Sequence, residues 1–230
     1  MERVGVQPAR SLPTGFPSLD RSLQTGGLPR ARITEVFGPA NCGKTALALQ
    51  IVAHSQRNRA SAAWIDAEHA FDPAFATALG VHLEDLPVAA PESAEDAMEI
   101  TRHFVESDAV DLVVVDSAAA LVPRLELETG VGILKLQTRV LGTALRHVVR
   151  SAARSDTSIL FLNQARTRMD GSGETSAGGA PLKLHAAVRI ALNKRAGGVH
   201  FRILKNKFGA SFASGSLEWR PGAGFVDAHA

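Results

Sequence analysis

The chain has 230 residues, of which 45% are hydrophobic and 21% are charged, as expected for one soluble globular domain. A single cysteine excludes a disulfide framework, and the sequence contains neither a signal-peptide core nor an apolar run of bilayer length. We therefore expect a cytoplasmic protein that does not associate with membranes.

The net charge of +2 conceals an uneven distribution. Residues 1–129 contain 10 Lys and Arg against 18 Asp and Glu, a balance of −8, whereas residues 130–230 contain 15 against 5, a balance of +10. Opposite signs in the two parts favour either an anion-binding surface on the second part or head-to-tail self-association. A solvated surface whose charges happen to be sorted along the chain explains the counts equally well.

The first half of the chain is predicted to alternate strands with helices. Ser93 and Asp96 have capping-box spacing at the start of one helix, and the β-branched run 112–116 is typical of a strand at the centre of a parallel sheet. In chain order the predicted elements are a strand at 33–37, a helix at 46–53, a strand at 62–66, a helix at 93–106 and a strand at 112–116.

The second half begins in the same way and then changes character. A long helix is predicted over 136–153 and a buried strand over 158–163, which continues the pattern of right-handed crossovers in a parallel sheet. Residues 167–179 are polar and glycine-rich without periodicity, which indicates a functional or mobile loop. Segments 187–193 and 199–205 flank a pair of glycines and are predicted to form an antiparallel hairpin.

A phosphate-binding loop is predicted between the first strand and the first helix, because residues 38–45 fit the pattern G-x-x-x-x-G-K-[ST] completely. Glycines allow the backbone N–H groups to turn toward phosphates, and the helix N-terminus adds partial positive charge. We expect Lys44 to reach the β- and γ-phosphates of ATP, and the Thr45 hydroxyl to bind Mg²⁺. The predicted nucleotide contacts in this loop are Gly38, Pro39, Ala40, Asn41, Cys42, Gly43, Lys44 and Thr45.

Carboxylates follow two further strands of the predicted sheet. Asp116 ends the central strand, where an aspartate assists Mg²⁺ binding in P-loop enzymes, and Glu68 follows another strand and could deprotonate an attacking water. The carboxyl ends of parallel strands meet at one sheet edge, where α/β proteins bind ligands. Cys42 is the only thiol; its place near a helix N-terminus favours a reactive, low-pKa group, although a small inert filler is the alternative.

The order of these motifs resembles the RecA-type recombinase family. The resemblance is colinear from about residue 14 to residue 226, and it implies a RecA-like ATPase core over 14–230 after a loose lead-in over 1–13. The implied fold is an α/β core, mainly a parallel sheet with helices on both faces, with a C-terminal antiparallel extension. The matching stretches are Thr14-Gly15, Ser18-Leu19-Asp20, Gly26-Gly27-Leu28-Pro29, residues 38–45, Ile65-Asp-Ala-Glu68-His-Ala70, Asp72-Pro73, Val113-Val-Val-Asp116-Ser117, Leu162-Asn163-Gln164, Arg166, Gly178-Gly179, Leu182-Lys183 and Lys205-Asn206-Lys207.

The resemblance also implies roles for residues outside the phosphate loop. Glu68 is implied to be the base that deprotonates the attacking water, and Gln164 is implied to sense the γ-phosphate. Lys205 and Lys207 are implied to contact ATP that is bound to a neighbouring subunit. An exposed basic strand end is the alternative for the two lysines.

Two more residues, Asp72 and Phe75, are implied to face the adenine. Phe75 stands where the family usually has a tyrosine, so that the stacking face is kept and the hydroxyl is lost.

Two segments resemble the DNA-binding loops of the family, namely 125–136 and 167–179. The first is about two residues shorter than usual, with apolar Ile133 and Leu134 in its middle, and the second contains no aromatic residue. Binding of single-stranded DNA without stacking platforms is expected to depend on charge. The predicted DNA contacts are Arg139, Arg166, Arg168, Lys183, Gly178 and Gly179.

Two functions remain open. The first is a DNA-dependent ATPase of recombination, repair and the SOS response to DNA damage. The second is a weakly active or non-enzymatic accessory protein, similar to the ImuA proteins of mutagenic repair, that docks on a full-length recombinase or a translesion polymerase complex. Only about a dozen residues precede the core, and a C-terminal domain that gathers duplex DNA is not expected. Self-association is therefore expected to be weak or dependent on a partner.

Overall fold

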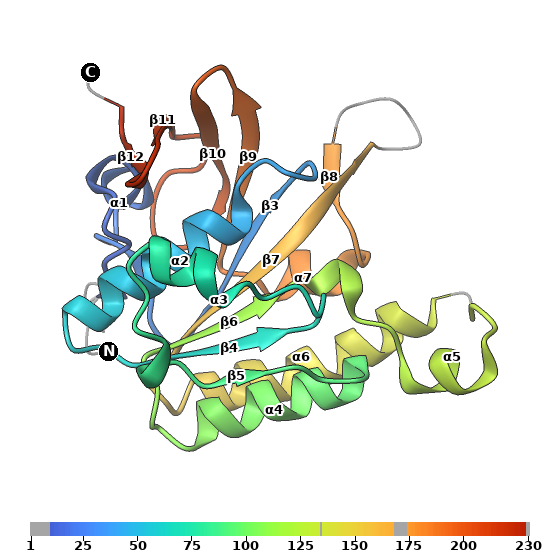
Figure 1. Ribbon diagram of the computed structural model, residues 1–230. Coiled ribbons are helices and arrows are strands. Elements are labelled where there is room, and N and C mark those ends of the chain that lie inside the picture. Colours follow the sequence, from blue (N-terminus) through green and yellow to red (C-terminus); the bar gives the residue numbers. More distant parts are fainter. Residues whose placement is uncertain (1–9, 134, 168–173, 229–230) are drawn as a thin grey trace, which may run out of the picture.

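The computed structural model describes residues 10–133, 135–167 and 174–228. A twisted sheet runs through the molecule in the strand order β12-β11-β10-β9-β3-β7-β6-β4-β5, and β8 pairs with β7 beside this path (Figure 1). The strands of this sheet are β3 Ile33–Gly38, β4 Ala62–Asp66, β5 Val88–Ala89, β6 Leu112–Asp116, β7 Ser158–Thr167, β8 Glu174–Ser176, β9 Val188–Arg195, β10 Gly198–Asn206, β11 Ser214–Arg220 and β12 Gly224–Asp227.

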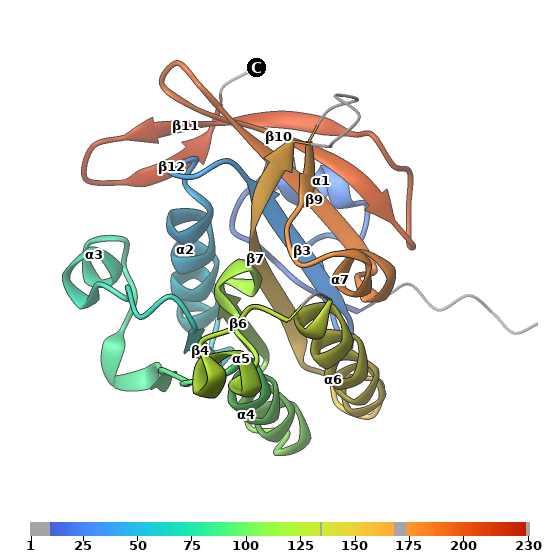
Figure 2. The same cartoon turned by 90° about the vertical axis from the view of Figure 1, so that its right-hand side faces the viewer.

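Helices cover both faces of this sheet. Helix α2 lies on one face and the pair α4 and α6 lies on the other, as Figure 2 shows along the strands. The helices are α1 Pro17–Leu23, α2 Lys44–Arg57, α3 Pro73–Ala78, α4 Ala94–Glu106, α5 Arg124–Thr129, α6 Leu136–Ala152 and α7 Ala180–His185, with 3-10 turns at Leu83–Asp85 and Ala118–Ala120.

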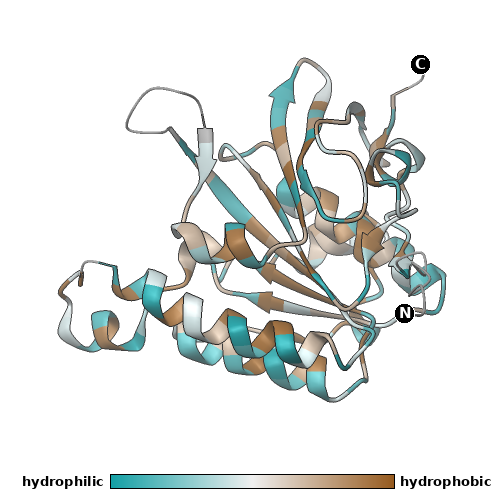
Figure 3. Cartoon of the chain, turned by 180° about the vertical axis from the view of Figure 1, so that it is seen from behind, coloured by the Kyte–Doolittle hydropathy of each residue, from teal (hydrophilic) through white to brown (hydrophobic). Residues whose placement is uncertain are grey.

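Strand β6 illustrates why the centre of the sheet needs an unbroken apolar run. Leu112 and Val114 belong to the core on the α2 face, whereas Val113 and Val115 belong to the core on the α4–α6 face. Side chains alternate across a strand, so a strand that is covered on both faces needs an apolar residue at every position. Figure 3 shows hydrophobic residues along the central strands, whereas α6 alternates between hydrophobic and hydrophilic residues.

The parallel core and its antiparallel extension are both confirmed. Strands β5, β4, β6, β7, β3 and β9 pair in parallel, and β10, β11 and β12 then continue the sheet in antiparallel fashion. The predicted hairpin corresponds to β9 and β10, which pair from Gly198↔Arg195 onward. The capping role of Ser93 is confirmed as well, because its side chain accepts a hydrogen bond from the Asp96 N–H.

Three segments differ from the expectation. The structureless loop predicted over 167–179 is wrong in part, because β8 pairs with the end of β7, from Ala165↔Ser176 to Thr167↔Glu174; residues 168–173 lie outside the described part. The predicted loop 125–136 contains most of α5, and Leu134 within it is not described. The lead-in expected over 1–13 ends in a short strand, β1 Ser11–Leu12, which pairs with β2 Leu28–Pro29, and its first nine residues are not described.

Within the described residues, no helix has the length and apolar character needed to cross a membrane.

Candidate nucleotide-binding site

The phosphate loop links the end of β3 to the start of α2, as the sequence predicts. Gly43 caps α2 with a φ of 91°, and a Cβ at this position would lie 2.5 Å from the ring of Phe225, so both conformation and packing require glycine here. The Lys44 Nζ donates hydrogen bonds to the carbonyl oxygens of Gly38 (3.2 Å) and Pro39 (2.8 Å). The ammonium group therefore lies over the loop in which phosphates would bind.

Thr45 and Asp116, the two residues predicted to bind Mg²⁺, are in contact in the structure. The Thr45 hydroxyl donates to Asp116 Oδ2 over 2.9 Å. Burial of Asp116 raises the pKa of its carboxyl group to about 6; the Thr45 hydroxyl opposes the shift, while the neighbouring carboxylates of Glu68 and Asp66 add to it. A cation at this place would stabilise the charged carboxylate.

The donor set fits Mg²⁺ bound together with a nucleotide. No group of three or more His, Cys, Asp or Glu side chains in the described part of the chain could hold a metal alone. Mg²⁺ usually takes only one or two protein ligands and completes its octahedron with waters and substrate phosphates. A hydroxyl and a carboxylate beside a phosphate loop are such a set.

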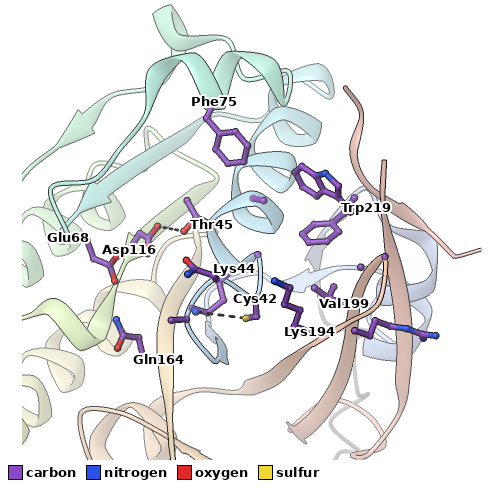
Figure 4. A pocket seen from close by; sticks show the side chains of 18 residues that line it. Cys42, Lys44, Thr45, Glu68, Phe75, Asp116, Gln164, Lys194, Val199 and Trp219 are labelled. Atoms are coloured by element: carbon purple, nitrogen blue, oxygen red, sulfur yellow. Dashed lines mark hydrogen bonds between the residues drawn. The ribbon is translucent and has the colours of Figure 1, made fainter. Parts of the chain in front are cut away.

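The two residues with predicted roles in hydrolysis flank the loop. Glu68 follows β4, where its backbone N–H donates to the Asp116 carbonyl over 3.2 Å, and its carboxylate accepts a hydrogen bond from the Ser117 hydroxyl. Gln164 lies on β7 directly beside Gly38 in the parallel register. Both side chains line the same pocket as Lys44 (Figure 4).

The far wall of this pocket comes from the last strands of the sheet. The pocket has a volume of about 640 Å³, and its lining includes four residues that no sequence motif predicts, namely Lys194, Arg195, Trp219 and Phe225. The rings of Trp219 and Phe225 meet edge to face at 5.1 Å. Phe75 lies across the pocket from Trp219 (Figure 4). No local sequence signal marks these residues, because only the pairing order from β9 to β12 brings them to the phosphate loop.

Asp72 does not line the pocket. Its side chain accepts hydrogen bonds from the N–H groups of Ala74 (2.9 Å) and Phe75 (3.0 Å) and so caps α3. Asp72 therefore holds the helix that presents Phe75 to the pocket.

Lys205 and Lys207 also lie outside the pocket lining. The Lys205 Nζ donates to the carbonyl oxygens of Lys183 (2.8 Å) and Leu184 (3.1 Å) at the end of α7, and burial lowers the pKa of this ammonium group. Lys207 is exposed. Both lysines thus lie away from the phosphate loop of their own chain, as contact with a nucleotide bound to a neighbouring subunit would require.

Most of the predicted DNA contacts gather where β7, β8 and α7 meet. Arg166 is exposed near the end of β7, and the Lys183 Nζ donates to the Thr175 hydroxyl over 2.6 Å. Gly178 and Gly179 join β8 to α7. Arg139 is exposed on α6, and Arg168 lies outside the described residues.

The expectation of a reactive Cys42 is wrong. The thiol is 1% exposed, and burial raises its pKa, although the nearby Lys44 opposes this shift. A buried thiol with a raised pKa is a poor nucleophile, so Cys42 acts as a small filler beneath the loop.

A buried polar network lies behind the site. Glu35 on β3 is fully buried and accepts hydrogen bonds from Arg189 on β9 and from Asn163 on β7, the latter over 2.9 Å. Arg189 also donates to the Ser176 hydroxyl over 3.1 Å, and the Asn163 amide donates to the Ala177 carbonyl over 3.1 Å. The network thus joins the strand of the phosphate loop to the segment that follows β8.

A complete phosphate loop on a parallel sheet, with a carboxylate at the end of a nearby strand, defines a P-loop nucleotide-binding protein. The family model for the RecA N-terminal domain matches residues 3–218. Protein RecA of Thermus thermophilus is 43% identical over 235 residues, which cover 94% of this chain and 69% of the relative. Protein RecA of Rubrobacter xylanophilus is 44% identical over 95% of this chain and 68% of its own length. Protein RecA of Rhodospirillum rubrum is 46% identical over 84% of this chain and 54% of its own length. The chain belongs to the RecA family, which supports nucleotide binding and a role in DNA recombination and repair.

Proposed function

We propose that the protein is a Mg²⁺-dependent ATPase of DNA recombination and repair that couples hydrolysis to the binding of single-stranded DNA. The observation that supports this most strongly is the meeting of four groups in one pocket: Lys44, the Thr45–Asp116 pair, Glu68 and Gln164. Each has a separate task in phosphoryl transfer. Lys44 and Thr45 come from the phosphate loop, Asp116 from the end of β6, Glu68 from the turn after β4 and Gln164 from β7.

The chemistry divides among these groups. Mg²⁺, when bound, neutralises charge on the β- and γ-phosphate oxygens. Lys44 gives up its hydrogen bonds to the carbonyl oxygens of Gly38 and Pro39 and contacts the same phosphates. Glu68 takes a proton from the attacking water, and the Ser117 hydroxyl orients its carboxylate for that task.

Gln164 supplies the coupling to DNA. Its side chain lines the nucleotide pocket, and its backbone carbonyl accepts a hydrogen bond from the Ala177 N–H over 2.9 Å. A shift of β7 in response to the γ-phosphate would therefore move the segment in which Arg166, Lys183, Gly178 and Gly179 gather. Binding of DNA there depends on charge and backbone contacts, and we expect it to weaken with added salt.

Phe75 and Trp219 form the base-binding part of the same pocket. Aromatic faces on two sides suit stacking of an adenine between them. Lys205 and Lys207 complete the proposal as cations for the nucleotide of an adjacent subunit, which would tie hydrolysis to assembly.

The test is the ATPase rate with and without single-stranded DNA, in wild type and in Glu68→Gln. The variant keeps the size of the side chain and removes the base, so ATP binding should persist while turnover falls about a hundredfold or more. Glu84→Gln is the matched control, because Glu84 is an exposed glutamate outside the pocket lining. Equal rates for Glu68→Gln and wild type would contradict the role of Glu68. A wild type that binds ATP without turnover would instead favour the accessory function on a recombinase or polymerase complex.

A further inference from the structure

Lys194 is, with Arg195, one of two cations lining the nucleotide pocket that the motifs do not explain. It lines the pocket together with the phosphate loop, although it stands 150 residues further along the chain than Lys44. Figure 4 shows its side chain directed into the space between Cys42 and Trp219. The last but one residue of β9 thus faces the place where a nucleotide would lie.

The pairing of β9 with β3 fixes this position. The two strands run in parallel from Thr34↔Val188 to Phe37↔Ala191, so their carboxyl ends reach the same sheet edge. A Cβ on Gly38 would lie 2.4 Å from the Leu192 carbonyl oxygen, which means that the two backbones are in contact at the start of the loop. Leu192 is buried in the core on the α2 face, and since side chains alternate, Lys194 faces the same side as α2.

The tip that carries Lys194 is held by strand β11. Only two residues separate β9 from β10, so the turn is short. The Trp219 N–H donates to the Gly197 carbonyl over 2.8 Å, and Arg195 donates to the Ser216 hydroxyl over 2.6 Å. These contacts to β11 place the lysine next to the pocket without help from a bound ligand.

No salt bridge is formed by Lys194 within the described part of the chain. Among the residues that the structure describes, no carboxylate lies within 4.0 Å of its ammonium group, and the acidic side chains that line the pocket are Glu68 and Asp116. In Figure 4 both of these lie on the other side of Lys44. Lys194 is exposed, and an exposed ammonium group beside a phosphate loop is suited to an anionic ligand.

We propose that Lys194 is a nucleotide-binding residue whose ammonium group contacts the phosphates of the nucleotide held by its own chain. The inference rests on the proposed ATP-binding function and extends it. Lys205 and Lys207 are assigned to the nucleotide of a neighbour, whereas Lys194 supplies a cation within one subunit. A single chain would then hold ATP with two lysines, one from the phosphate loop and one from the hairpin.

Equilibrium binding of ATP, ADP and adenosine tests this contact, measured by competition with a fluorescent ATP analogue. Lys194→Gln should weaken ATP and ADP binding about tenfold, as expected for a lost charge-assisted hydrogen bond, and leave adenosine binding unchanged. Lys194→Arg should retain most of the affinity. Arg202→Gln is the matched control, because Arg202 is an exposed cation on the same hairpin, outside the pocket lining and stacked on Phe212.

The outcomes separate the two proposals. If wild type binds ATP and Lys194→Gln binds it equally well, the contact is refuted while the proposed ATPase function stands. A loss of ATP and adenosine binding to the same extent would also refute it, because the pocket would then have been distorted. A wild type that binds no ATP would refute the proposed function together with the contact. Equal thermal unfolding midpoints of wild type and Lys194→Gln establish that both proteins are folded.

Discussion

The buried carboxylate of Asp116 lowers the stability of the folded protein at neutral pH. In the folded protein its pKa is about 6, above the ordinary value of 3.8, chiefly because the group is buried. A raised pKa means that the folded state holds the proton more tightly than the unfolded state. The contribution of Asp116 to stability is therefore greatest at low pH and is lost as the pH rises from about 4 to about 6.

Asp116→Asn should therefore raise the stability of the nucleotide-free protein while it abolishes Mg²⁺-dependent hydrolysis. The amide can still accept the Thr45 hydrogen bond without a buried charge, and we expect a gain of about 1–2 kcal/mol at pH 7.5. Thermal unfolding at pH 7.5 and pH 5 measures the effect, which should shrink at the lower pH, where the native carboxyl group is largely protonated. A variant less stable than wild type at pH 7.5 would contradict the assignment of burial as the main cause.

Trp219 offers a direct signal for occupation of the pocket. It is 39% exposed and lines the pocket, whereas the other tryptophan, Trp64, is 1% exposed and packs against Phe71. ATP should change the emission of Trp219 alone. Trp219→Phe should remove the nucleotide-dependent change in emission. Because a stacking ring remains, the affinity for ATP should fall only a few-fold. A response that persists in the variant would assign it to Trp64 and place the base elsewhere.

Between elements, the Glu35–Arg189 pair connects strands β3 and β9 inside the protein. Arg189→Met should destabilise the fold by about 3–5 kcal/mol, because it leaves the fully buried carboxylate of Glu35 without its cation. Urea denaturation measures this loss. The double variant Glu35→Gln/Arg189→Met should recover much of it, since Gln still accepts from Asn163 without a charge. A single variant that loses less than about 1 kcal/mol would show that solvent reaches the carboxylate.

Elements that depend on local sequence were predicted well. Strands β4 and β6 begin and end where their apolar runs do, because burial on both faces leaves a continuous signal. Strands β8, β11 and β12 were missed because β8 and β12 have only three and four residues and β11 has one buried residue, so none of them has a continuous apolar signal. Trp219 and Lys194 were missed because only the assembled sheet brings β9 and β11 to the phosphate loop, whereas the phosphate loop, Glu68, Asp116 and Gln164 could be found from motifs. Cys42 was misjudged because proximity to a helix N-terminus gives no information about burial.

On the scale of the whole molecule, the strands of the acidic and the basic part of the chain are separated in space, whereas the basic helix α6 packs against α4 beside the acidic part. Strands β9 to β12 come from the basic part of the chain and β4, β5 and β6 from the acidic part, and they occupy opposite ends of the sheet. Opposite charges at opposite ends favour head-to-tail contacts, a geometry that can extend into filaments.

We expect a monomer, or an oligomer that is weak and sensitive to salt, because screening limits what charge alone can hold together. Sedimentation velocity with ATP, Mg²⁺ and single-stranded DNA should show association at about 0.1 M salt and loss of it at about 1 M, where the Debye length falls to about 3 Å. Long filaments that resist ~1 M salt would contradict this expectation and require an extensive apolar interface.

The contact of Gly43 with Phe225 has a consequence for the order of events during synthesis. The phosphate loop is translated early, but the wall against which it packs is formed by residues 219 and 225. At about 5–20 residues per second, roughly 10–40 s separate the two on the ribosome. During that interval the nascent chain holds a phosphate loop without its aromatic wall, so a nucleotide can bind to the complete pocket only after residues 219 and 225 have been made.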